Sequence, residues 1–137
     1  MRLKDKVALI TGAGNGIGRE TSLLLAAEGA AIAAVDLDEE AVSEVVEEIK
    51  ARGGVAVAEY SSVATPDGGA AIVQKALDEF GRVAVVINNA GILRDKAFHN
   101  MEVDQITAVL DVHLRGAFYV TKAAWPHLRE QSYGRVV

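Results

Sequence analysis

A glycine-rich stretch near the N-terminus contains the residues best suited to bind a charged ligand. It reads Thr11-Gly12-Ala13-Gly14-Asn15-Gly16-Ile17-Gly18 and lies between a short apolar run and a helical pattern. Glycines permit a tight turn and let the main chain approach a ligand closely, because no Cβ atom intervenes. A helix that begins here directs free N–H groups and the positive end of its dipole towards an anion. The stretch therefore predicts a phosphate or diphosphate site, with an ordinary strand-to-helix turn as the alternative.

A carboxylate roughly 20 residues further on adds a second feature of a dinucleotide site. Asp36 ends the next apolar run, where its oxygens can accept hydrogen bonds from ribose hydroxyls. The same negative charge would repel a 2′-phosphate, and no cation adjoins Asp36, so the pattern favours NAD over NADP. Arg19 is expected to face phosphate or solvent. A helix-capping or solvated carboxylate is the alternative interpretation of Asp36.

The elements that would position these residues alternate between β-branched runs and helical periodicity. This alternation predicts an α/β fold, a Rossmann-type doubly wound parallel sheet. Strands are expected at residues 6–10, 30–35, 55–59 and 83–87, the last of them central. Helices are expected at about residues 19–28, 38–52 and 65–80 and from Glu102 to Arg129, with Asp38 capping the second helix and Pro66 in the first turn of the third. Pro126 should bend the last helix or lie near its end.

The C-terminal residues 133–137 resemble the opening of a fifth strand that is cut short. We therefore expect residues 1–137 to be the N-terminal part of a longer dinucleotide-binding domain, truncated at the fifth strand.

The composition excludes several classes of function. The chain has 137 residues, a formal net charge of −5 and no cysteine. The acidic excess argues against a nucleic-acid partner, and the lack of cysteine excludes disulfides and zinc–thiolate sites. No histidine pair has metal-ligand spacing, so no metal site is predicted. No apolar run is long enough to cross a membrane, and we expect a cytoplasmic protein.

A second motif, Asn88-Asn89-Ala90-Gly91, directly follows the fourth predicted strand. Together with the glycine stretch it resembles the two signatures of the short-chain dehydrogenases/reductases. The stretches NNAGILRDKAF and VHLRGAFYVTK look like (3R)-hydroxyacyl-CoA dehydrogenases and, less closely, 3-oxoacyl-[acyl-carrier-protein] reductases. The resemblance implies an NAD-dependent oxidoreductase that moves hydride between nicotinamide and a small-molecule secondary alcohol or ketone. A non-catalytic dinucleotide-binding module or fragment is the alternative.

The resemblance also implies which residues would hold the cofactor. The turn residues would bind the pyrophosphate and the adenosine side, Asp36 the ribose, Ser62-Val63 the adenine, and residues 89–91 the path to the nicotinamide. The full set is Gly12, Asn15, Gly16, Ile17, Gly18, Asp36, Ser62, Val63, Asn89, Ala90 and Gly91. Asn88 would instead tie strands together.

The sequence departs from the family at several positions. Ser62 and Ala84 replace residues that are Asp in many members, and His113 stands where the family often has a catalytic Asn. The alternative interpretation of His113 is a partly buried helical histidine. The family's catalytic Ser and Tyr-x-x-x-Lys are expected beyond the fifth strand, so no catalytic residue is predicted within this chain.

Two further expectations concern the last helix. Tyr119 and Lys122 are three positions apart instead of four and lie on the wrong helix for a catalytic pair. In the family, the helix that corresponds to the region from Glu102 to Arg129 packs against a partner subunit, which implies a homo-oligomer.

Overall fold

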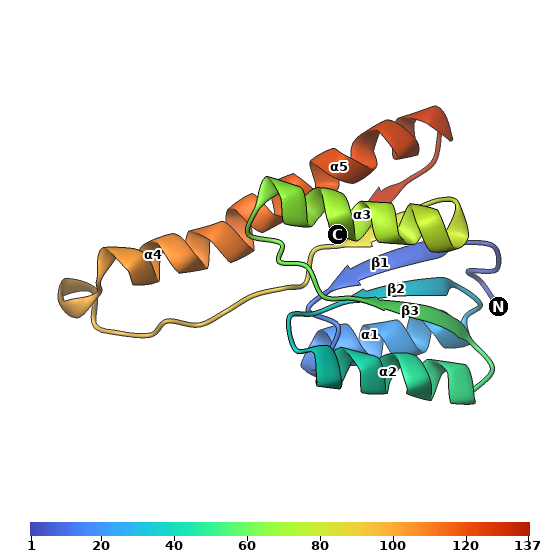
Figure 1. The fold of residues 1–137 in the computed structure, drawn as a ribbon, viewed down its shortest axis with the longest axis horizontal. Coiled ribbons are helices and arrows are strands. Elements are labelled where there is room, and N and C mark those ends of the chain that lie inside the picture. The colour runs from blue at the N-terminus through green and yellow to red at the C-terminus, as the bar shows by residue number, and fades with distance from the viewer.

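A parallel five-stranded sheet with helices on both faces forms the centre of the computed structural model, which describes residues 1–137 (Figure 1). The strand order is β3-β2-β1-β4-β5. The strands are β1 (Val7–Thr11), β2 (Ala31–Val35), β3 (Val55–Glu59), β4 (Val85–Ile87) and β5 (Arg135–Val136). The predicted α/β class and the parallel sheet are confirmed.

The centre of the sheet is β1 and not β4, contrary to the prediction. All five residues of β1 are buried, whereas β4 is only three residues long and pairs with β1 on one side and the short β5 on the other. The chain runs outward from β1 through β2 to β3 and then returns to β4 on the opposite side. Such a reversal opens a crevice at the carboxyl ends of the strands, here between β1 and β4.

The helices cover the sheet in two layers. On one face lie α1 (Gly16–Ala27) and α2 (Glu39–Ala51), and on the other lie α3 (Pro66–Phe80) and α5 (Gly116–Glu130) (Figure 1). Separate hydrophobic clusters fill the two layers, one centred on Ile10 and Val42 and the other on Leu9 and Ile72. The two clusters follow from the strand period of two, which points Leu9 and Ile10 to opposite faces.

The predicted helix boundaries at α2 and α3 are confirmed by their caps. The Asp38 side chain accepts a hydrogen bond from the Ala41 N–H at 3.1 Å, and the Thr65 hydroxyl accepts one from the Gly68 N–H at 3.0 Å. Caps of this type stabilise a helix by about 1 kcal/mol each. Gly81 ends α3 with a φ of 75°, in the left-handed region that glycine adopts without strain.

The last helical region differs from the prediction of one continuous helix. It consists of α4 (Val103–Leu110), a π-helical segment (Asp111–Arg115) and α5, which contains Pro126, and a 3₁₀ turn (Phe98–Asn100) precedes it. The wider π-helical turn changes which side chains share a face. In α5 the buried residues include Val120, Ala124 and Leu128, whereas Leu110, Leu114, Phe118 and Trp125 are exposed.

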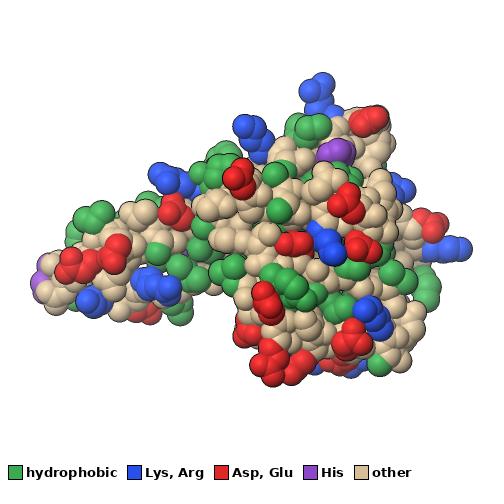
Figure 2. Space-filling model, in the orientation of Figure 1, with side chains coloured by type: hydrophobic (Ala, Val, Ile, Leu, Met, Phe, Trp, Pro, Cys, Tyr) green, Lys and Arg blue, Asp and Glu red, His purple; other side chains and the backbone are tan.

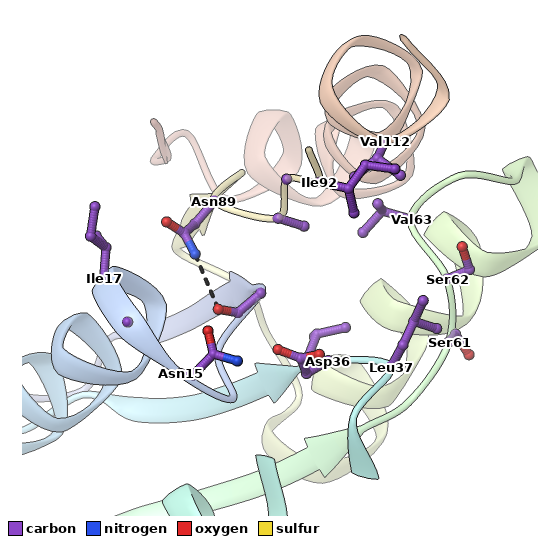
Figure 3. A pocket seen from close by; sticks show the side chains of 15 residues that line it. Asn15, Ile17, Asp36, Leu37, Ser61, Ser62, Val63, Asn89, Ile92 and Val112 are labelled. Carbon is purple, nitrogen blue, oxygen red and sulfur yellow. Dashed lines mark hydrogen bonds between the residues drawn. The ribbon is translucent and has the colours of Figure 1, made fainter. Parts of the chain in front are cut away.

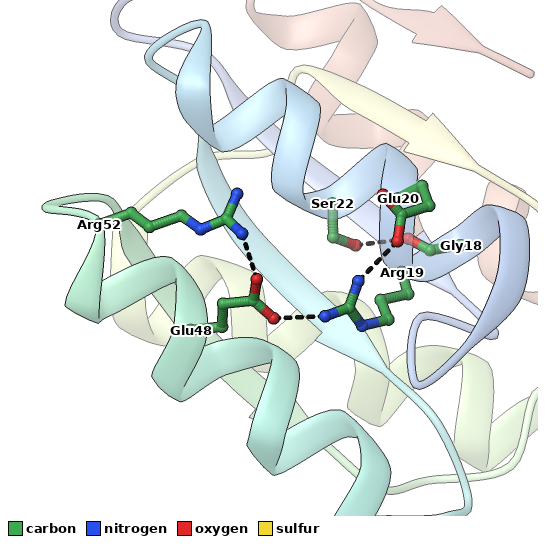
Figure 4. A network of polar contacts seen from close by, with 6 residues as sticks. All are labelled: Gly18, Arg19, Glu20, Ser22, Glu48 and Arg52. Carbon is green, nitrogen blue, oxygen red and sulfur yellow. Dashed lines mark hydrogen bonds and ion pairs between the residues drawn. The ribbon is translucent and has the colours of Figure 1, made fainter.

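A chain of charged side chains joins α1 to α2 on the outer surface (Figure 4). The Arg19 guanidinium contacts Glu20 and Glu48, each at 2.5 Å, and Glu48 also pairs with Arg52. Arg19 lies at the surface with 35% of its side chain exposed, and two carboxylates hold its guanidinium, so of the two predicted environments it has the solvent-exposed one and not the phosphate site. Ion pairs with this exposure contribute about 0–1 kcal/mol each.

No helix of the structure combines the length and the apolar character that crossing a bilayer requires.

Candidate functional site

A pocket of about 370 Å³ opens at the carboxyl ends of β1, β2 and β4 (Figure 3). Its wall contains the predicted residues Gly12, Asn15, Gly16, Ile17, Asp36, Ser62, Val63, Asn89, Ala90 and Gly91. Residues far apart in the sequence thus meet at the reversal of strand order, where α/β sheets bind their ligands. Of the predicted set only Gly18 lies outside the lining.

Gly18 contributes to the site by close packing. A Cβ atom at Gly18 would lie 2.1 Å from the Gly12 carbonyl oxygen and 2.6 Å from Asn89 Nδ2. Both distances are far below van der Waals contact, so only glycine lets α1 begin this close to the turn. Gly18 is not among the pocket-lining residues, because α1 buries it against the turn, and its predicted part in cofactor binding stays a prediction.

The turn before α1 exposes main-chain donors to the pocket. Gly12 and Gly16 have φ values of 65° and 54°, which glycine adopts without a steric penalty. Asn15 is the N-cap residue of α1, yet its side chain makes no capping hydrogen bond, and the first turn contains no acidic residue. The N–H groups of that turn, at the positive end of the helix dipole, therefore remain open to an anion.

The Asp36 carboxylate points into the pocket and is held by two main-chain N–H groups (Figure 3). Its Oδ2 atom accepts from Gly14 N–H at 2.9 Å and its Oδ1 atom from Asp38 N–H at 3.0 Å. A carboxylate has about four lone-pair positions, so each oxygen can accept a further hydrogen bond. Asp38, and not Asp36, caps α2.

Asn89 and Thr11 fasten the end of β4 to the glycine turn. The Asn89 side-chain amide donates to the carbonyl oxygens of Thr11 and Gly12, each at 3.1 Å (Figure 3 shows one contact of this amide). The buried Thr11 hydroxyl accepts from the N–H groups of Asn89 and Ala90, at 3.1 and 3.0 Å. Asn89 thus lines the pocket, as predicted, and also fixes its shape.

Asn88 ties β4 to a helix as well as to a strand. Its side-chain amide donates to the Thr121 hydroxyl on α5 at 3.1 Å, and its main-chain N–H donates to the Val137 carbonyl at 2.8 Å. The predicted link between strands is made by the main chain, while the side chain reaches α5.

His113 approaches the pocket from the π-helical segment. Its Nε2 atom lies 3.0 Å from Ile92 N and 2.8 Å from Ile92 O, and a Cβ at Gly91 would lie 2.6 Å from the imidazole Cε1. The imidazole therefore packs directly behind the pocket wall. His113 is exposed, in contrast to the partly buried histidine of the alternative interpretation.

The end of the pocket beyond Asp36 is formed by Leu37, Ser61, Ser62 and Val63. The Ser61 hydroxyl donates to Glu59 Oε1 at 2.6 Å, and the Ser62 hydroxyl accepts from Ala64 N–H at 3.1 Å. Both hydroxyls are thereby fixed in direction at this end of the pocket.

The sequence analysis missed several lining residues: Val35, Leu37, Ser61, Ile92 and Val112. Apolar residues such as Ile92 and Val112 carry no chemical signal in the sequence. Val112 lies far from both motifs in the sequence, and only the fold of the last helical region brings it to the pocket. Position next to a predicted residue could have indicated Val35, Leu37, Ser61 and Ile92.

Tyr119 and Lys122 lie away from the pocket. Neither belongs to its lining, and the Tyr119 main chain packs against Gly69 of α3, where a Cβ would come within 2.8 Å. The structure also contains no group of three or more His, Cys, Asp or Glu side chains arranged to hold a metal ion.

This fold and pocket are those of a nucleotide-binding α/β protein, and comparison with known proteins identifies the family. The model of the short chain dehydrogenase family matches residues 6–137, and the chain belongs to this family. A short-chain type dehydrogenase/reductase of Mycobacterium tuberculosis is 54% identical over 98% of this chain. The peroxisomal hydratase-dehydrogenase-epimerase of Neurospora crassa is 51% identical over 98% of the chain, which covers 14% of that protein.

A solved structure shows the same arrangement of elements. The short chain dehydrogenase from Mycobacterium avium superimposes with a TM-score of 0.92 at 37% identity over 99% of this chain. The chain spans 50% of the M. tuberculosis relative and 54% of the M. avium chain.

Proposed function

We propose that this chain is the cofactor-binding part of an NAD-dependent oxidoreductase. The observation that carries the proposal is the Asp36 carboxylate, fixed at the pocket beside the open N–H groups of α1. The amides would hold the pyrophosphate, and Asp36 would accept hydrogen bonds from the ribose hydroxyls. The bound nicotinamide supplies the hydride chemistry between a secondary alcohol and a ketone.

The charges around the pocket support NAD over NADP. No Lys or Arg side chain belongs to the lining, so nothing there would neutralise a 2′-phosphate. Arg19, which directly follows the glycine stretch in the sequence, has its guanidinium paired with Glu20 and Glu48. A 2′-phosphate would thus meet the Asp36 carboxylate without a compensating cation.

The substrate of the proposed reaction is a 3-hydroxyacyl thioester or a similar secondary alcohol. Support comes from the likeness to a peroxisomal protein whose name includes a dehydrogenase activity. The apolar side chains of Ile92 and Val112 lie in the wall beyond Asn89. In this proposal the catalytic Ser, Tyr and Lys lie outside residues 1–137.

Titration with NADH tests the proposal. We expect the protein fluorescence of Trp125 and the tyrosines, and that of NADH, to report saturable binding, and the Asp36→Ala variant to bind more weakly. The absence of NADH binding to the folded protein would contradict the proposed function. A non-catalytic module is the second candidate, and it is favoured by the position of Tyr119 and Lys122 outside the pocket lining. Both candidates predict that residues 1–137 bind NADH without turnover of 3-hydroxyacyl-CoA, and turnover by a longer chain that contains these residues would favour the enzyme.

A homo-oligomer through the region from Glu102 to Arg129 is part of the proposal. Large apolar side chains are exposed along this region: Phe118 and Trp125 of α5 have 66% and 51% of their surface accessible. Hydrophobic side chains are also exposed on the projecting part of the molecule that contains α4 (Figure 2). Exposed apolar side chains of this size are typical of an interface between subunits. Sedimentation should show an oligomer that Phe118→Glu dissociates. Leu24→Glu, which changes an equally exposed leucine on α1, should not dissociate it, and a monomeric native protein would contradict this part.

A cytoplasmic location remains a prediction from the sequence.

A further inference from the structure

Gly14 is a glycine that the shape of the turn does not require. It lies between Gly12 and Gly16 in the glycine-rich stretch, and its φ is not among the positive values found at those two residues. An alanine could therefore adopt the backbone conformation at this position. A different constraint must be sought in what surrounds the missing side chain.

That constraint is the Asp36 carboxylate. A Cβ at Gly14 would lie 2.9 Å from Asp36 Oδ2 and 3.1 Å from Asp36 Cγ, and 3.1 Å from the Ala41 Cβ of α2. The contact with Oδ2 is shorter than Cβ atoms adopt in proteins, so one of the partners must move. The main chain at Gly14 is held between β1 and α1, whereas the Asp36 side chain can rotate.

Rotation would remove the hydrogen bonds that orient the carboxylate. Gly14 N–H donates to Oδ2 at 2.9 Å and Asp38 N–H donates to Oδ1 at 3.0 Å, so both oxygens are fixed from the protein side. This arrangement directs the remaining lone pairs into the pocket. The two adjacent hydroxyls of a ribose could then donate hydrogen bonds to both carboxylate oxygens at once. A phosphate on either hydroxyl would instead be repelled by the carboxylate charge.

We propose that Gly14 is a specificity-determining residue. Because Gly14 has no Cβ, Asp36 can lie against the turn and bind the unphosphorylated ribose diol of a dinucleotide. The inference rests on the proposed NAD site and extends it, since it assigns the selection between NAD and NADP to a pair of residues. Gly14 has no contact of its own with the sugar in this scheme. It acts only through the position of Asp36.

A double-mutant cycle tests the inference. Dissociation constants for NADH and NADPH are measured by fluorescence titration for the wild-type protein, Gly14→Ala, Asp36→Ala and the double variant. Loss of one hydrogen bond to a charged group corresponds to about a tenfold change in affinity. We expect Gly14→Ala to weaken NADH binding about tenfold, to change NADPH binding by less than about threefold, and to have no further effect in the Asp36→Ala background.

The outcomes separate this inference from the proposed function. Failure of the wild-type protein to bind NADH would overturn both. If the wild-type protein binds NADH and Gly14→Ala weakens NADH binding equally in the wild-type and Asp36→Ala backgrounds, the role of Gly14 is overturned and the NAD site remains. Thermal unfolding shows whether each variant folds. If Gly14→Ala does not, Ala41→Gly is added to relieve the 3.1 Å contact with α2, and the same cycle is measured in that background with the same two outcomes.

Discussion

The close packing of Gly18 against the glycine turn leads to a quantitative prediction for Gly18→Ala. The new methyl carbon would lie 2.1 Å from the Gly12 carbonyl oxygen, 2.6 Å from Asn89 Nδ2 and 2.8 Å from the Gly12 carbonyl carbon. Two of these atoms belong to the main chain, so no change of side-chain rotamer can relieve the short contacts with them. The turn and α1 must separate, and the Asn89 amide must leave at least one of its two carbonyl partners.

The expected cost follows from these contacts. Inserting a methylene group into a packed interior costs about 1–3 kcal/mol, and a main-chain clash belongs at the upper end. The weakened Asn89 hydrogen bond adds about 1 kcal/mol. With a urea m-value of about 1–3 kcal/mol/M, a total loss of about 4 kcal/mol should lower the unfolding midpoint by about 1–4 M. NADH affinity should fall as well, because the displaced turn carries the N–H groups proposed to hold the pyrophosphate.

Urea unfolding and NADH titration of Gly18→Ala are compared with those of Gly53→Ala. Gly53 has a φ of 83°, and a Cβ atom at this position would have no neighbour within 4 Å, so alanine there adds backbone strain of about 1–2 kcal/mol without a clash. This control should lose stability and keep its NADH affinity. Native stability and native NADH affinity in Gly18→Ala would refute the packing argument.

Three further substitutions have defined outcomes. Asn89→Asp replaces a donor by an acceptor opposite the carbonyl oxygens of Thr11 and Gly12, and urea unfolding should show a loss of about 1–3 kcal/mol; an unchanged midpoint would be inconsistent with the bridge. His113→Ala removes the hydrogen-bond partner of Ile92, so amide exchange at Ile92 should accelerate about tenfold, and unchanged exchange would show that the imidazole does not hold this segment. The pKa of Glu28 is lowered, mainly by a hydrogen bond from the Arg2 main chain and next by one from the Arg2 side chain. The ionised Glu28 carboxylate therefore stabilises the fold at pH values above its ordinary titration range, and this contribution is lost as the pH falls through the lowered folded-state pKa. Thermal unfolding of Glu28→Gln should accordingly show lower stability than the wild-type protein at neutral pH and equal stability in acid; a difference independent of pH would argue against the linkage.

Local signals in the sequence predicted much of the fold. The strand β3 and the helix α3 have the expected bounds, because Thr65, Pro66 and Gly81 mark the helix ends by their own conformational preferences. The order of strands in space is a tertiary property, and hydrophobicity alone wrongly placed β4 at the centre. The π-helical segment has no sequence signature, because its residues continue the helical periodicity.

The pocket was predicted better than its internal contacts. The glycine stretch, Asp36 and the family resemblance together predicted ten of its 15 lining residues, since the two motifs follow strands whose carboxyl ends meet at one edge of the sheet. The roles of individual side chains depend on distances that spacing does not contain. Gly18 packs instead of lining the pocket, Arg19 pairs with Glu48, and His113 bonds to Ile92 across a loop.

The central claim is that the charge of Asp36 selects a dinucleotide without a 2′-phosphate. The most direct measurement is the ratio of the NADPH and NADH dissociation constants for the wild-type protein and for Asp36→Asn, which removes the charge and keeps the size of the side chain. We predict that NADH binds more tightly to the wild-type protein and that the ratio falls about tenfold or more in the variant. An equal ratio in the two proteins, or tighter NADPH binding by the wild-type protein, would contradict the claim.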